Sequence, residues 1–202
     1  MKIDFKLVNQ LPLVIIDNYY DQSSCDLIWK ELLFLNSNNK LMPPEKTGSA
    51  KDPSTKQLLK KNTALSLDNT YKIREVSNIL TVNRKLFEIQ VELENLHPFF
   101  RYLGGSNSDR TIISYYEDTD YYKPHRDKST ITALSWFFQE PKKFTDGNLV
   151  LENTEIECKN NRTVIFSSML DHEVTPLKMN QLDQGKNLGR FTITQFATVN
   201  FD

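Results

Sequence analysis

The sequence predicts an α+β fold, in which helices come first and a β-sandwich or jelly roll follows. Apolar residues recur at helical spacing over residues 23–35 and 72–103. From residue 109 onward the pattern changes to short runs rich in β-branched and aromatic residues, separated by turn signals such as the D-G-N of residues 146–148. Because the helical and extended patterns are segregated along the chain, the fold is expected to be α+β rather than a series of βαβ units.

The composition is typical of a globular protein and excludes two broad classes of function. At this length, residues 1–202 are expected to form a single domain. Residues 1–105 are expected to provide mainly helical support and a flap, and residues 106–202 to form the jelly-roll core. A formal net charge of −1 argues against a nucleic-acid partner. No apolar run approaches the ~18 residues of a membrane span, and the N-terminus does not resemble a signal peptide. The only cysteines, Cys25 and Cys158, form no disulfide framework, so we expect a cytoplasmic protein with reduced thiols.

The chain begins with the expected pattern of a strand followed by a helix. Residues 11–17 form an apolar run that predicts a buried strand. Ser23 or Ser24 precedes a helical pattern that continues to Leu35, so one of these serines is the expected N-cap. A second helical region is expected over residues 72–103.

Residues 36–62 differ in composition from both neighbouring helical regions. They are rich in Asn, Pro, Lys and Ser, which predicts a long exposed loop. Because loops of this length in compact domains are usually functional or disordered, the segment is interpreted either as a lid over a substrate or as an ordinary solvated loop.

The second half of the chain is predicted to be almost entirely β. Many short strands at near-regular spacing are typical of a sandwich or jelly roll. Strands are expected over residues 111–116, 130–138, 149–151, 162–166 and 191–199.

A short stretch of the second half, Y-Y-K-P-H-R-D at residues 121–127, carries two candidate metal ligands. In an extended strand His125 and Asp127 lie on the same face, since side chains two residues apart point the same way. His172, which follows an apolar run, is a candidate third ligand. Two histidines and one carboxylate that leave open positions are the ligand set of non-haem Fe(II) oxygenases.

Two other interpretations of this motif are weaker. An H-x-D pattern is common by chance. H-R-D also begins the catalytic loop of protein kinases, but that loop needs an Asn five residues after the Asp, and Thr132 stands there. The remaining histidine, His97, precedes a proline near an expected helix break and is interpreted as a packing or surface residue.

The last predicted strand contains a candidate anion-binding residue. Arg190, Thr192 and Thr194 share one face of this strand. An arginine on an inward face must be paired. The carboxylate of a ligand would suit the guanidinium group, and a carboxylate from a neighbouring strand is the alternative.

Together these motifs resemble the Fe(II)- and 2-oxoglutarate-dependent dioxygenases, in particular their prolyl 4-hydroxylase-like branch. The resemblance covers residues 109–199 and implies a double-stranded β-helix with N-terminal helices packed against it. It also implies that His125, Asp127 and His172 are the iron ligands. The motifs that carry it, in the order of the family, are Y-Y-E-D-T-D-Y-Y-K-P-H-R-D, D-G-N-L-V-L, V-I-F-S-S-M-L-D-H-E-V-T-P and G-R-F-T-I-T-Q-F.

The same resemblance implies a binding site for 2-oxoglutarate. Arg190 would hold the distal carboxylate of 2-oxoglutarate, with Thr192 beside it. Tyr116, nine residues before His125, matches a tyrosine that often hydrogen-bonds this co-substrate, and Tyr115 is the alternative. One departure from the family pattern is a longer stretch before Arg190, where residues 178–187 look like an inserted loop.

The activity that the resemblance implies is hydroxylation of an unactivated C–H bond. The cofactors would be Fe(II), 2-oxoglutarate and O2, with succinate and CO2 as co-products and ascorbate as a candidate reductant for the iron. Related halogenases replace the carboxylate ligand with a small residue, and this chain retains Asp127. The resemblance favours a peptidyl substrate residue such as proline. A free amino acid, a small metabolite, or a non-catalytic metal-binding jelly roll are the alternatives.

Overall fold

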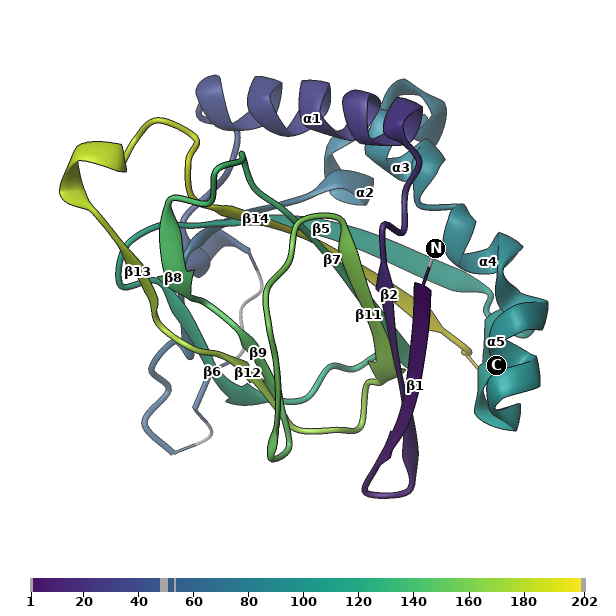
Figure 1. The fold of residues 1–202 in the computed structure, drawn as a ribbon. Helices are drawn as coiled ribbons and strands as arrows, with labels where there is room; N and C mark the ends of the chain where they lie inside the picture. Colours follow the sequence, from purple (N-terminus) through teal and green to yellow (C-terminus); the bar gives the residue numbers. More distant parts are fainter. Residues whose placement is uncertain (1, 48–50, 53, 201–202) are drawn as a thin grey trace.

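The computed structural model describes residues 2–47, 51–52 and 54–200 (Figure 1). Its core is a double-stranded β-helix made of two antiparallel sheets that face each other. A further two-stranded ribbon pairs β8 (Phe144–Asp146) with β13 (Leu177–Met179). The larger sheet contains, in spatial order, β1 (Lys2–Val8), β2 (Leu11–Asp17), β11 (Arg162–Ser167), β7 (Ile131–Phe137), β14 (Arg190–Thr198), β5 (Ser108–Tyr116) and β4 (Thr63–Ser66). The smaller sheet contains β10 (Thr154–Ile156), β9 (Leu149–Leu151), β12 (His172–Val174), β6 (Tyr121–His125) and β3 (Lys60–Lys61).

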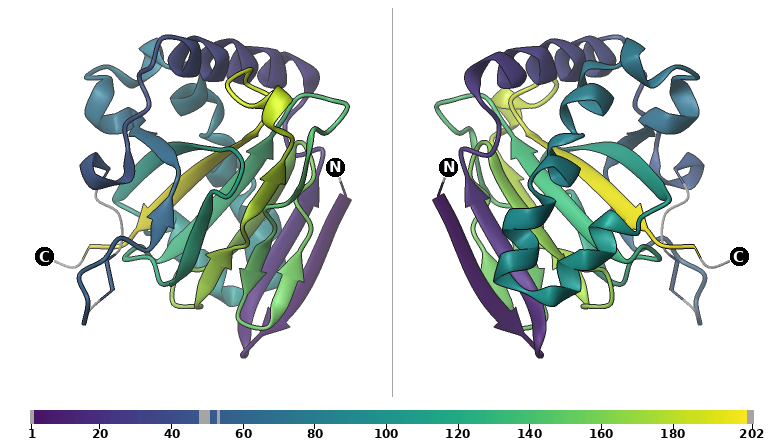
Figure 2. Two further views of the ribbon diagram at one scale, coloured as in Figure 1. Left: turned by 90° about the vertical axis from the view of Figure 1, so that its left-hand side faces the viewer. Right: turned by 90° about the vertical axis from the view of Figure 1, so that its right-hand side faces the viewer.

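Helices cover the outer face of the larger sheet (Figure 2). Central strands of this sheet, such as β2 and β7, are therefore buried on both faces. In β2, Val14 and Ile16 pack toward the helices, whereas Leu13 and Ile15 point into the barrel, and this explains the unbroken apolar run of the strand. The helices are α1 (Gln22–Ser37), α2 (Leu67–Thr70), α3 (Asn78–Val82), α4 (Lys85–Glu88), α5 (Gln90–Leu96) and α6 (Arg101–Gly104).

The strands and first helix predicted from the sequence are present, but the predicted cap of that helix is wrong. Asp21 is the N-cap of α1, because its backbone is extended and its carboxylate accepts a hydrogen bond from the Ser24 N–H at 2.8 Å. Ser23 and Ser24 lie inside the first turn. The carboxylate of Asp21 also accepts a hydrogen bond from the Ser23 hydroxyl.

The second predicted helical region is a series of short helices rather than one long element. The chain bends away from α5 at His97, whose backbone is extended because the next residue is a proline. The first half of the chain also contains β1, β3 and β4, which the sequence did not predict. These strands extend both sheets at their edges.

The described parts of residues 36–62 make specific contacts at both ends of the segment. Met42 and Ala64 exchange backbone hydrogen bonds of 2.8 and 2.9 Å, and Lys60–Lys61 pairs with β6. Gly48, Ser49, Ala50 and Pro53 of the expected lid lie outside the described residues. Among the described residues, no helix is long and apolar enough to cross a membrane.

Candidate metal centre and co-substrate pocket

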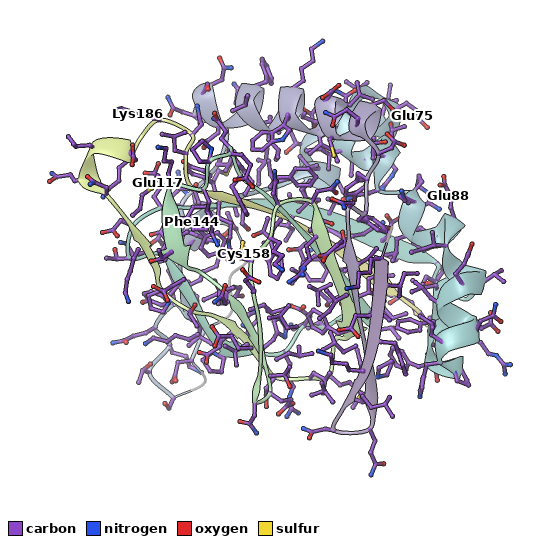
Figure 3. The ribbon with its side chains drawn as sticks, in the orientation of Figure 1. Glu75, Glu88, Glu117, Phe144, Cys158 and Lys186 are labelled. Carbon is purple, nitrogen blue, oxygen red and sulfur yellow. The ribbon has the colours of Figure 1, made fainter. Side chains whose placement is uncertain are left out.

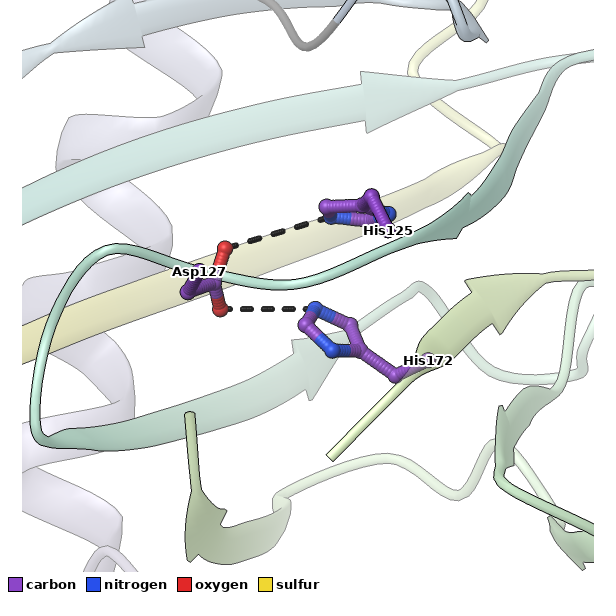
Figure 4. A group of neighbouring side chains, drawn as sticks. All are labelled: His125, Asp127 and His172. Atoms are coloured by element: carbon purple, nitrogen blue, oxygen red, sulfur yellow. Dashed lines mark ion pairs between the residues drawn. The ribbon is translucent and has the colours of Figure 1, made fainter. Parts of the chain in front are cut away.

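The three candidate metal ligands come together where β6 ends and β12 begins. His125, the last residue of β6, lies directly opposite His172, the first residue of β12. Asp127 follows two residues after His125 and turns back toward both imidazoles (Figure 4). The pairing contains a bulge: between the pairs His125–His172 and Tyr122–Val174, β6 has two residues and β12 has one. The bulge brings Tyr122 and His125 to the same side, where their rings stack at 3.6 Å between centroids.

Each imidazole is oriented by the backbone carbonyl group two residues before it. The Nδ1 atom of His125 lies 2.9 Å from the Lys123 carbonyl oxygen, and that of His172 lies 3.0 Å from the Leu170 carbonyl oxygen. A neutral imidazole that donates Nδ1–H in this way directs its Nε2 lone pair to the centre of the group. Nε2 of His172 is 3.3 Å from Oδ2 of Asp127, and Nε2 of His125 is 3.9 Å from Oδ1. The three ligand atoms lie within 4.8 Å of one another.

The carboxylate of Asp127 is held by a chain of hydroxyl groups. Thr132 donates a hydrogen bond of 2.7 Å to Asp127 Oδ2. The Thr132 hydroxyl also lies 2.8 Å from that of Ser168, which contacts the Ser129 hydroxyl at 2.7 Å. These contacts restrict the rotation of the carboxylate before any ligand binds.

The electrostatics of two of the three residues, His125 and Asp127, favour the protonation states that bind metals. Burial lowers the pKa of His125 to about 4, and the charge of His172 adds to this effect. Burial raises the pKa of Asp127, but the hydrogen bond and charge of His172 outweigh it, so that the pKa is lowered overall. For His172 burial lowers the pKa, while the hydrogen bond and charge of Asp127 raise it overall. At neutral pH Asp127 is therefore ionised and His125 is neutral, as metal ligation requires.

The three ligands line a cavity of about 580 Å³ that also contains Arg190. Arg190 is completely buried, and its guanidinium carbon lies 4.1 Å from the centroid of the Tyr116 ring. One guanidinium nitrogen donates to the Gly147 carbonyl oxygen. The other two, Nε and Nη2, and the Thr192 hydroxyl have no hydrogen-bond partner in the described part of the chain. Because a buried cation without a partner is costly, this end of the cavity fits a ligand carboxylate held by the guanidinium fork.

Of the two candidate tyrosines, only Tyr116 lines this cavity. Tyr115 points to the opposite face of β5, packs against Phe191 at 4.5 Å between ring centroids, and donates its hydroxyl to Glu117 at 2.8 Å. Its hydroxyl also accepts from the Gly189 N–H at 3.0 Å. Tyr115 therefore has its own partners outside the cavity.

Glycine at position 189 keeps Arg190 in register despite the longer loop before it. A Cβ atom on Gly189 would lie 2.2 Å from the Tyr116 carbonyl oxygen, so β14 and β5 approach too closely here for any side chain. The backbone pairing then places Arg190 opposite Tyr116. The residues before it form β13 and a 3-10 turn at Gln181–Asp183.

Two other cationic residues of the second half of the chain, Arg162 and Lys186, do not line the cavity. Arg162 forms two hydrogen bonds with the carboxylate of Asp17 in the neighbouring strand. Lys186 is exposed at the periphery of the molecule (Figure 3). His97 is also remote, because its Nδ1 accepts from the Phe99 N–H and its ring lies against Phe5.

Comparisons with known proteins agree with this geometry. Residues 111–198 match the family model described as the 2OG-Fe(II) oxygenase superfamily. The matched segment contains the three candidate metal ligands and Arg190. The family match, the shared fold and the triad together identify the protein as a dioxygenase that uses Fe(II) and 2-oxoglutarate, with O2 as the oxidant. No curated protein sequence matches the chain.

The fold of this 2OG-Fe(II) oxygenase is shared with solved prolyl hydroxylases. A Pseudomonas putida prolyl-4-hydroxylase has a TM-score of 0.60 at 12% identity, with 94% of this chain and 93% of that chain covered. A viral collagen prolyl hydroxylase from Paramecium Bursaria Chlorella virus-1, solved as a 2OG complex, has a TM-score of 0.54 at 13% identity, with 93% and 96% covered. A 2OG-Fe(II) oxygenase family oxidoreductase from Burkholderia pseudomallei has a TM-score of 0.58 at 12% identity, with 93% and 85% covered.

Two polar residues that line the cavity, Thr132 and Lys60, and the buried Asn62 next to β3 were not identified from the sequence. Thr132 donates a hydrogen bond to Asp127. This contact could not be predicted from the sequence, because it forms only when β7 folds beside Asp127. Lys60 and Asn62 lie in the segment interpreted as a lid, yet they are only 7% and 4% exposed. Both amide atoms of Asn62 lack a hydrogen-bond partner among the described residues. Their burial depends on pairing with β6 and β5, which sequence patterns do not show.

Proposed function

We propose that this oxygenase hydroxylates a peptidyl residue such as proline, with conversion of 2-oxoglutarate and O2 into succinate and CO2. The observation that carries the proposal is that one cavity joins three converging candidate metal ligands to a buried arginine, two of whose guanidinium nitrogens have no hydrogen-bond partner in the described part of the chain. A cavity with both features holds a metal and a dicarboxylate together.

The residues of the cavity have distinct roles in this proposal. His125, Asp127 and His172 would hold the iron through Nε2, a carboxylate oxygen and Nε2. Arg190 binds the distal carboxylate of 2-oxoglutarate. When bound, iron and 2-oxoglutarate supply the oxidising chemistry that hydroxylates an unactivated C–H bond.

Two further residues complete the co-substrate end of the cavity. Thr192 lies two residues after Arg190 on the same face of β14, and its unpaired hydroxyl is free to donate to the same carboxylate. Tyr116 supports the guanidinium group by stacking and presents its hydroxyl as a second donor. Leu134 and Trp136 form an apolar wall of the cavity, which excludes water from the reacting groups.

Two observations support a peptide as the substrate over a free amino acid or small metabolite. The cavity runs along alternate residues of β14 from Arg190 to Thr198, a length of roughly 25 Å. The fold is also shared with two prolyl hydroxylases, one of which acts on collagen according to its name. A single free amino acid would fill only a fraction of such a groove.

The test is succinate release by the purified protein with Fe(II), 2-oxoglutarate, ascorbate and a pool of proline-containing peptides. We expect release that depends on both iron and 2-oxoglutarate, and a peptide product heavier by one oxygen atom in mass spectrometry. Release stimulated by free amino acids but by no peptide would instead support the small-molecule alternative. If iron and 2-oxoglutarate give no succinate under any of these conditions, the proposal fails.

A further inference from the structure

The cavity contains a second buried cation, Lys60, which the reaction described above does not use. Lys60 belongs to the edge strand β3 and lies directly opposite Tyr122 of β6. It is 7% exposed and lines the cavity. Its ammonium group lies 5.5 Å from the centroid of the Tyr122 ring, and in the described part of the chain it has no hydrogen-bond or ion-pair partner.

The neighbouring lysine of β3, Lys61, differs from Lys60 because it is exposed and has polar partners. The Lys61 side chain is 54% exposed, and its ammonium group lies 3.5 Å from Asp120. It also donates to the Thr119 hydroxyl. Burial alone lowers the pKa of Lys60 to about 8, with no carboxylate acting on it. An ammonium group kept in such a place costs stability unless an anion binds it.

Lys60 is positioned to bind a different anionic group from the one proposed for Arg190. Arg190 projects from β14 in the larger sheet, whereas Lys60 projects from the edge of the smaller sheet. Tyr122, opposite Lys60, stacks on the ring of His125. Lys60 and His125 therefore both contact the ring of Tyr122, which places Lys60 at the metal end of the cavity, where the reacting part of a substrate must be held.

The remaining charges of the cavity are also predominantly positive. Among the described residues that line it, Asp127 is the only carboxylate, and it belongs to the metal ligands. Arg126 is neutralised by two hydrogen bonds of 2.9 Å to Asp171. Arg110 and Lys128 are exposed and form no ion pair within the described chain. Apart from Arg190, the cavity thus has one buried and two exposed positive charges without a negative partner among the described residues.

We propose that the substrate is an acidic peptide, in which an Asp or Glu side chain near the hydroxylated residue binds Lys60. Further acidic residues of the peptide face Arg110 and Lys128. This inference rests on the proposed function and names its substrate class. It makes Lys60 the residue that determines specificity, because only this cation is both buried and next to the metal ligands.

The test compares two peptide probes that differ only in charge, acetyl-Gly-Glu-Glu-Pro-Glu-Glu-Gly-amide and its counterpart with Gln in place of every Glu. Their dissociation constants are measured by calorimetry with the full chain loaded with Mn(II), a non-reactive substitute for Fe(II), and 2-oxoglutarate. The wild type should bind the acidic peptide more tightly by about tenfold or more, the effect of one buried charged hydrogen bond. Lys60→Met should abolish most of this preference.

Lys61→Met is the matched control, since it removes the same charge one residue away from an exposed position. It should keep the preference to within about threefold, as expected for an exposed charge. Lys60→Met is expected to fold, because methionine keeps an unbranched apolar side chain in a buried place and removes an unpaired charge. Its melting temperature should be equal to or above that of the wild type.

Three outcomes would overturn the proposal. They are equal binding of the two probes by the wild type, no binding of the acidic probe, and an unchanged preference in Lys60→Met. A fourth would reassign the charge: if Lys60→Met weakens 2-oxoglutarate binding as strongly as Arg190→Gln does, Lys60 serves the co-substrate and the proposal is wrong. Failure of the proposed function is seen separately, as an absence of succinate release while the preference for the acidic probe persists.

Discussion

The polar groups at the two ends of the cavity differ in how completely they are hydrogen-bonded within the protein. At the metal end, His125, Asp127 and His172 all have hydrogen-bond partners within the protein, through carbonyl oxygens or the Thr132 hydroxyl. At the other end, Arg190 has one backbone partner, and two of its guanidinium nitrogens have none among the described residues. Both ends are deeply buried, so the difference is not one of access to water.

This difference separates a site that is already assembled from one that needs its ligand. The metal end is organised in advance by its surroundings, as is typical of metal ligands with outer partners. The Arg190 end retains a desolvated charge whose cost is removed only when an anion binds. We therefore expect metal to bind without 2-oxoglutarate, and 2-oxoglutarate to raise the melting temperature of the metal-loaded protein.

The largest expected effect is loss of the metal end. His125→Ala or Asp127→Ala removes one of three ligands, so Mn(II) affinity and succinate release should both fall by more than about a hundredfold. Calorimetry with Mn(II) and a succinate assay measure the two effects. His97→Ala is the matched control and should change neither. Unchanged Mn(II) binding in both ligand variants would remove the metal site from this position.

The next effect is confined to the other end. Arg190→Gln leaves the distal carboxylate of 2-oxoglutarate without its charged partner, which costs roughly 2–5 kcal/mol. The half-saturating concentration of 2-oxoglutarate should rise by about thirtyfold to several thousandfold, while Mn(II) affinity is retained. Arg190→Lys should recover part of the loss, since it restores the charge but not the two-pronged geometry. A variant that folds and keeps the wild-type half-saturating concentration would show that another residue anchors the carboxylate.

The two adjacent tyrosines allow a finer test of the same end. Tyr116→Phe removes a hydroxyl group inside the cavity and should raise the half-saturating concentration of 2-oxoglutarate by about twofold to tenfold. Tyr115→Phe should leave that concentration unchanged and lower the melting temperature, because the N–H of Gly189 loses its acceptor. The reverse result in steady-state assays would mean that Tyr115 is the residue that contacts the co-substrate.

The smallest expected effect concerns a partly buried arginine that already has its partner. Arg162→Gln should leave 2-oxoglutarate binding unchanged and reduce the free energy of unfolding by about 1 kcal/mol, since the pair with Asp17 is partly solvated. The hydrogen bond from Arg162 lowers the pKa of Asp17 below 3.8. The stability from this pair is therefore present above that pH and lost as the pH falls through the lowered pKa. Urea unfolding at pH 7 and near pH 3 should show the difference between variant and wild type shrinking in acid.

Much of the fold and the metal group could be predicted from local sequence patterns. The central strands of the larger sheet contain long apolar runs, because both of their faces are buried under helices or inside the barrel. His125 and Asp127 are neighbours in sequence, so their proximity requires only the end of one strand. His172 and Arg190 could be nominated from the sequence because each stands at a recognisable position beside a strand, and both line the cavity.

Only the tertiary structure decided how the partners of these residues are distributed. The bulge between β6 and β12 places Tyr122 on His125, and the close approach at Gly189 places Arg190 over Tyr116 instead of Tyr115. Burial of Lys60 depends on pairing between segments about sixty residues apart. The physical reason is that side-chain periodicity is a local property of the backbone, whereas desolvation and missing hydrogen-bond partners arise from every segment that surrounds a residue.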